Sequence, residues 1–288
     1  MKRTVPIFIF ALLTLSCVAA EAQGLRCTFR YSHKIEADGK YKTLDDLKLD
    51  YCNQRTAFYA DVSFLRDSLR VHAFDEKGRR IDNDAYAQLS RLPLGLPDYA
   101  LMDFAAGWQA LYHEMGPLAI IGDGGLELPE WELVPDTDTL LLGYAAQKAA
   151  ADYLGRRWEI WFAPEIPAPV GPWLLWGAPG LIVSAHDSEN LFVFEMTGLE
   201  SLDTDSRISF LKWYYEDFFE RRQFKLQRFP LFRAESVYYK ARTDIDFMNQ
   251  AMGKSGSRAY MVDSNGMRRE LKMPPYIPII PTQYKGRK

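Results

Sequence analysis

Three carboxylates stand close to a group of tryptophans in the middle of the chain. The carboxylates are Glu159, Glu165 and Asp187, and the tryptophans are Trp161, Trp173 and Trp176. Glycoside hydrolysis needs two carboxylates beside the scissile bond, often flanked by aromatic rings. Glu165 has the most apolar neighbours and is therefore the best candidate for an acid catalyst. The same residues also fit a binding surface without catalysis, formed by Trp161, Glu165, Trp173 and Trp176.

Other catalytic or metal-binding patterns are incomplete. The four histidines are widely separated, at positions 33, 72, 113 and 186. The dipeptide His113–Glu114 starts like a zinc-protease motif, but Pro117 stands where the second histidine belongs. The segment 253–255 imitates the end of a phosphate-binding loop, yet Met248 replaces its first glycine. We expect no metal ion and no cofactor.

The tryptophan cluster lies in a proline-rich segment. Between residues 164 and 179 the prolines are Pro164, Pro167, Pro169, Pro172 and Pro179. Pro179 presets φ and Gly180 supplies a positive φ, so residues 178–181 should form a type II turn that opens the next strand. Because each proline restricts the unfolded chain, we expect an ordered loop.

The most specific motif is the hexapeptide Gly-Ala-Pro-Gly-Leu-Ile at residues 177–182. Together with Gly171-Pro172-Trp173 and the run 161–167, it resembles the GLPGLI family of exported proteins from Bacteroidetes-type bacteria. Ala178 stands where the family name has leucine. The matching motif residues are Gly171, Pro172, Gly177, Ala178, Pro179, Gly180, Leu181 and Ile182. The resemblance implies an envelope location and a shared fold. Because the family has no agreed activity, it implies no catalytic residue.

Residues 1–22 have the form of a secretory signal. A basic start precedes an apolar run over residues 5–15, and small residues precede a cleavage site after Ala22. The apolar run is too short to span a bilayer, so we expect a periplasmic or secreted protein without a transmembrane segment. Lipid attachment at Cys17 is an alternative, although Thr14 departs from the lipobox pattern.

Cys27 and Cys52 remain after signal removal. In an oxidising compartment this even number predicts a disulfide, because a strand over residues 47–52 can pair back onto the first strand. Two separate buried thiols are the alternative.

The charge distribution argues against nucleic-acid binding. The formal net charge is −3, and the arginine pairs are dispersed along the chain rather than gathered into one patch. The expected partner is an envelope protein or an apolar ligand.

Short apolar runs separated by glycine and proline predict successive antiparallel strands, and helical spacing elsewhere predicts a few packing helices. We therefore expect an α+β fold with a mostly antiparallel sheet that is cupped or half-barrel in shape. We expect residues 23–288 to form one domain, with a family core over about 118–200, a C-terminal helix and an extended tail. The expected helices are 62–69, 81–92 and 208–219. The expected strands are 26–36, 47–52, 118–121, 126–134, 140–144, 147–153, 157–162, 181–184 and 191–196.

These features favour a non-catalytic envelope protein that binds an apolar ligand or a protein partner through the loop 161–182. The alternative is an envelope hydrolase that acts on glycan or peptide with Glu165 as its acid. A third interpretation gives the proline loop a purely structural role. The binding interpretation predicts that Trp173→Ala or Trp176→Ala weakens binding and leaves the melting transition largely unchanged.

Overall fold

The structure is a computed structural model, and it describes most of the chain after the amino-terminal segment. The expected signal peptide, residues 1–22, and Cys17 within it lie outside the described residues. The described ranges are 24–75, 77–93, 95–96, 98–115, 118–218, 225–251, 260–262, 267–270, 273 and 275–286.

Strands make up most of the regular structure. The strands are β1 (Gly24–Lys34), β2 (Tyr41–Cys52), β3 (Arg55–Ala60), β4 (Asp98–Asp103), β5 (Trp108–Met115), β6 (Leu118–Gly125), β7 (Glu132–Leu133), β8 (Thr139–Leu141), β9 (Tyr144–Tyr153), β10 (Arg156–Ala163), β11 (Leu181–Asp187), β12 (Phe192–Leu202), β13 (Lys225–Pro230), β14 (Tyr260–Val262) and β15 (Arg268–Glu270). The helices are α1 (Asp61–Ala73), α2 (Asn83–Arg91), α3 (Ser206–Trp213), the π-helical turn η1 (Tyr214–Phe218), α5 (Leu231–Thr243) and α6 (Ile245–Ala251).

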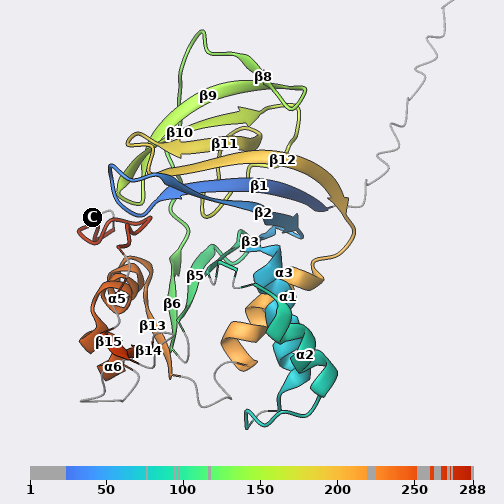
Figure 1. The fold of residues 1–288 in the computed structure, drawn as a ribbon. Coiled ribbons are helices and arrows are strands. Elements are labelled where there is room, and N and C mark those ends of the chain that lie inside the picture. Colours follow the sequence, from blue (N-terminus) through green and yellow to red (C-terminus); the bar gives the residue numbers. More distant parts are fainter. Residues whose placement is uncertain are drawn as a thin grey trace, which may run out of the picture.

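One large sheet organises the molecule (Figure 1). Its strands follow the order β13-β6-β5-β4-β3-β2-β1-β12-β11-β10-β9-β7, with β8 paired to β9, and β14 and β15 form a separate small sheet. Every pairing is antiparallel except that of β13 with β6. The strands from β8 to β12 run across the view, whereas β5 and β6 run nearly upright, as the twist of a large sheet requires. The predicted α+β fold with a mostly antiparallel sheet is confirmed.

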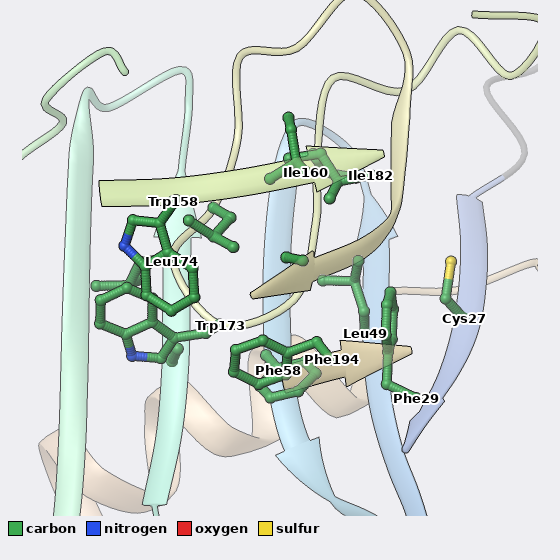
Figure 2. Close-up of a cluster of buried hydrophobic side chains, with 14 of the residues drawn as sticks. Cys27, Phe29, Leu49, Phe58, Trp158, Ile160, Trp173, Leu174, Ile182 and Phe194 are labelled. Carbon is green, nitrogen blue, oxygen red and sulfur yellow. The ribbon is translucent and has the colours of Figure 1, made fainter. Parts of the chain in front are cut away.

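The two faces of the sheet carry separate cores. One face holds the main core, part of which Figure 2 shows, with Phe58 beside Phe194 and Trp158 beside Trp173. The opposite face is covered by α1, α3 and η1, which pack on tyrosines of β3, β4 and β5. Helix α5 packs on β6 through Leu118 and Ile120. Since Ile120 pairs with His113 across the ladder, α5 lies on the same face as His113.

The expected disulfide between Cys27 and Cys52 is not formed, and both residues are buried free cysteines. The prediction that their strands pair was correct, because Cys27 lies opposite Leu49. Cys52 lies three residues beyond Leu49, and an odd offset places a side chain on the other face of a strand. Cys27 therefore belongs to the main core and Cys52 to the core under α3.

None of the helices within the described ranges has both the length and the apolar character that a membrane span requires.

Candidate functional site

A cavity of about 140 Å³ lies on the main-core face of the sheet. It is bounded by the sheet, by α5, by the loop between β10 and β11 (residues 164–180, the Pro/Trp-rich loop) and by the C-terminal tail (residues 275–286). Its walls are largely aromatic, and one side carries titratable groups. The aromatic residues of the lining are Tyr31, Phe58, Tyr99, Trp173, Phe192, Phe194 and Tyr276. The titratable side chains are His33, Lys42, Asp98, His113, Glu235 and Arg242.

His113 sits between two carboxylates. Asp98 on β4 is its direct cross-strand partner on β5, and Nδ1 of His113 lies 2.8 Å from Oδ1 of Asp98. On the other side, Nε2 lies 2.7 Å from Oε1 of Glu235 on α5, an ion-pair contact whose geometry makes no hydrogen bond in the described part of the chain. The Tyr238 ring stacks on the imidazole with 4.1 Å between ring centroids. These contacts hold the imidazole in one orientation.

The surroundings of His113 favour its charged form. Burial disfavours the imidazolium, but the carboxylates of Glu235 and Asp98 outweigh burial and raise the pKa of His113 to about 10. At neutral pH the ring therefore carries both protons, and both ring nitrogens face carboxylates. His113 is thus a fixed cation that neutralises part of the acidic charge, and it is unsuited to accept a proton as a general base.

One face of α5 supplies the opposing wall of the site. Glu235, Tyr238 and Arg242 follow one another at spacings of three and four residues, so they project from the same side of the helix. The helix approaches β6 closely because Gly122 has no side chain: a Cβ there would lie 2.5 Å from Cβ of Ala234. Small residues at this crossing therefore set the distance from Glu235 to His113.

The C-terminal tail forms part of the cavity wall through Tyr276, Ile277 and Ile279. Arg156 holds this tail, since its guanidinium donates to the carbonyl oxygens of Pro278 at 2.9 Å and Ile279 at 2.7 Å. The same guanidinium pairs with the buried Asp187 at 3.0 Å. Asp187 thereby serves as an anchor of the tail.

Trp173 is the residue of the Pro/Trp-rich loop that lines the cavity. It is buried, lines the cavity, and its ring centroid lies 5.7 Å from that of Trp158 (Figure 2). Its backbone has φ of 56°, a left-handed conformation that bulky residues rarely adopt. The hydrogen bond from the Leu175 amide to the Pro172 carbonyl closes this turn.

The other candidate binding residues lie apart from the cavity. Trp161 is half-buried beside His186, and Lys148 lies over its ring. Trp176 anchors the loop, because its Nε1 donates to the Glu127 carbonyl at 3.0 Å. Glu165 is exposed and accepts a hydrogen bond from the backbone of Ala145. Of the four predicted residues, only Trp173 reaches the cavity.

The motif residues build the loop. Gly180 has φ of 157°, and a Cβ there would lie 2.3 Å from the carbonyl oxygen of Ala163, so only glycine fits. The positive φ agrees with the prediction, but the predicted type II hydrogen bond does not form. The Ala178 carbonyl accepts from the Gly180 amide, and the Leu181 amide donates to Ile166. The remaining motif residues are Gly171, Pro172, Gly177, Pro179 and Ile182, of which Gly171 packs against Ile182.

Glu159, another carboxylate singled out from the sequence, makes a surface ion pair. Its carboxylate contacts Lys148 at 2.5 Å and His186 at 3.8 Å, and the Lys148 contact and charge hold the pKa of Glu159 below its ordinary value. Glu159 and Glu165 are not among the residues that line the cavity.

A second polar cluster lies on the opposite face. Asp67 of α1 is buried, accepts a hydrogen bond from Tyr99 and pairs with Arg70 at 3.2 Å. Burial outweighs Arg70 and raises the pKa of Asp67 to about 7. Arg70 also binds Glu114 and the hydroxyl of Tyr214. The adjoining cavity measures about 60 Å³, too small for more than a few water molecules.

Within the ranges that the structure describes, no group of three or more histidine, cysteine, aspartate or glutamate side chains is arranged to hold a metal ion.

Sequence reasoning missed most of the site. It considered His113 only as part of a metal motif and left residues 231–243 without an assignment. The available signal was the spacing of Glu235, Tyr238 and Arg242, which marks one helical face that carries a carboxylate, a ring and a guanidinium.

No family model matches the chain, and no curated protein matches it. Among solved structures, the chain is similar to PNGF-II in space group C2, with 13% identity and a TM-score of 0.47, and to PNGF-II in space group P21, with 12% identity and a TM-score of 0.48. Each match covers 77% of this chain and 34% of the other, so the chain spans about one third of PNGF-II. These TM-scores are too low to establish a shared fold.

Proposed function

We propose that this protein is an exported binding protein of the cell envelope, and that it holds a small, mainly apolar ligand in the cavity beside His113. The observation that carries the proposal is a cavity with aromatic walls to which five separate parts of the chain contribute. These are the sheet, the Pro/Trp-rich loop, α5, the residues after α2 and the C-terminal tail. Ligand sites are commonly concave and mostly apolar, with a few polar groups that fix orientation.

The cavity volume limits the ligand. A cavity of about 150 Å³ with apolar walls holds a molecule of the size of benzene. The volume of about 140 Å³ here therefore suits one six-membered ring or a short aliphatic chain. A longer ligand would keep the remainder outside the cavity.

The site favours binding over catalysis. His113 is committed to two carboxylates, and its raised pKa keeps it protonated at neutral pH. Glu165, the residue of the hydrolase alternative, is exposed and bound to the backbone of Ala145. Glu165 is not among the described residues that line the cavity.

Calorimetric titration with toluene tests the proposal. The matched variant is Ala100→Leu, because Ala100 is buried on β4 and lines the cavity, so added methyl groups occupy the space of the ligand. We expect the wild-type protein to bind toluene and Ala100→Leu to bind it at least tenfold more weakly, with an unchanged or higher Tm. Absence of binding to the wild type, or equal affinity in both proteins, would refute the proposal.

A further inference from the structure

The titratable side of the cavity holds a guanidinium that forms no ion pair with an acid in the described part of the chain. Arg242 of α5 is half-buried, its Nη1 donates to the hydroxyl of Tyr238 at 3.2 Å, and its guanidinium lies 4.9 Å from the ring centroid of Tyr276. Among the described residues, no carboxylate forms an ion pair with it within 4.0 Å. Buried arginines are usually paired with an acid.

The nearby carboxylates lie against His113, and Asp98 acts on Arg242 only through its charge. Asp98 and Glu235 both contact His113, so the charges of these three groups sum to one negative charge. Arg242 and the exposed Lys42 add two positive charges to the cavity lining. The charged groups that line the cavity therefore include one more cation than anions.

His33 adds a polar atom that lacks a partner. Its Nδ1 is buried and has no hydrogen-bond partner in the described part of the chain. The ring stacks on Tyr31 with 4.9 Å between centroids. Burial, and then the charge of Lys42, lower the pKa of His33, while Asp98 opposes this effect and Arg242 adds to it. An anion bound beside this ring would raise its pKa.

We propose that the natural ligand of the cavity is a small monocarboxylate, with its carboxylate bound by Arg242 and its ring or short chain among the aromatic side chains. This inference rests on the proposed function. The planar guanidinium favours a carboxylate, since the two groups match in a paired, two-bond geometry. Tyr238 and Tyr276 hold the guanidinium, which reduces the entropy lost on binding.

Three probes of similar size separate the two proposals: benzoate, the uncharged benzamide, and toluene. We expect the wild type to bind benzoate at least about tenfold more tightly than benzamide, as a charge-assisted hydrogen bond provides. In Arg242→Met this preference should disappear, so that benzoate and benzamide bind with equal affinity. The matched control is Arg233→Met, because Arg233 is exposed on the same helix and lies over Phe229, outside the cavity lining.

Two further measurements keep the inference testable if Arg242→Met fails to fold. Lys42 is exposed, so Lys42→Met should fold normally and should reduce the preference for benzoate over benzamide. In the wild type, the pKa of His33 measured by NMR should rise when benzoate is added. Equal affinity for benzoate and benzamide, or a preference that survives in Arg242→Met, would overturn the inference and leave the proposed function standing. If the wild type binds no toluene, the proposed function fails, and the inference that rests on it fails with it.

Discussion

Glu235 of α5 and His113 of β5 meet at 2.7 Å, and this contact joins the C-terminal helix to the centre of the sheet. Both side chains are almost completely excluded from solvent, with 0% of Glu235 and 4% of His113 exposed. A buried carboxylate without a countercharge would be strongly destabilising. The packing of α5 on the sheet therefore depends on whether the His113 imidazole is protonated. Because α5 forms one wall of the cavity, the cavity depends on the same protonation.

The pH dependence of stability tests this coupling. The pKa of His113 is raised from 6.5 to about 10 in the folded protein. The stabilisation is therefore fully present below pH 6.5 and is lost as the pH rises through about 10. We expect the free energy of unfolding in urea to fall across this range. In Glu235→Gln it should be lower at pH 7 and should fall less steeply. An NMR titration in which the His113 ring loses its proton near its ordinary value would contradict the assignment.

The close crossing of α5 and β6 gives a second prediction. Gly122→Val places methyl groups against Ala234 and Leu231, so we expect a loss of about 1–3 kcal/mol in the free energy of unfolding, together with weaker toluene binding. Gly124→Ala is the matched control, because a Cβ at Gly124 on the same strand meets nothing within 4 Å. Chemical denaturation measures both variants. Equal stability of Gly122→Val and the wild type would show that α5 does not pack here.

The cysteines give a third prediction. Since Cys27 and Cys52 face opposite sides of the sheet, both should be alkylated by iodoacetamide in the unfolded protein without reductant. In the folded protein both should be protected, because they are buried and burial raises the pKa of the Cys27 thiol far above its ordinary value. Peptide mapping by mass spectrometry distinguishes the two states. A crosslinked pair of peptides containing Cys27 and Cys52 would disprove the register given for β1 and β2.

The mutational test of Trp173 that the sequence suggested needs revision. The binding interpretation expected that Trp173→Ala leaves the melting transition unchanged, but Trp173 is buried in the main core. Loss of such an indole typically costs about 3–5 kcal/mol. Weaker binding by Trp173→Ala could therefore result from lost stability rather than from a lost ligand contact. For this reason Ala100→Leu is the better variant for the binding test.

Alternation of polar and apolar residues predicted strand β1, and short apolar runs between glycine and proline residues predicted the strands from β9 to β12. Strand β1 and the strands from β9 to β12 have one face toward the core, and their sequences show it. Strand β4 was missed because its central residues, from Tyr99 to Met102, are all buried. A strand covered on both faces has no alternating pattern.

Helix α5 was missed for a related reason. It packs on β6 and also buries Glu235, so its charged and apolar residues do not separate into two faces. The site depends on this helix and on β5, which are far apart in the chain. Spacing along the sequence shows only neighbours on one element, so it cannot place His113 against Glu235. Trp173 was found because its proline-rich surroundings were unusual on their own.

The most direct test of a ligand-binding cavity is a crystal structure of the protein grown with toluene. We predict density for one six-membered ring between Trp173, Ala100 and Phe194, with the contacts of His113 to Asp98 and Glu235 unchanged. A structure in which Trp173 or Phe194 itself fills this space, with no ring bound at saturating toluene, would contradict it.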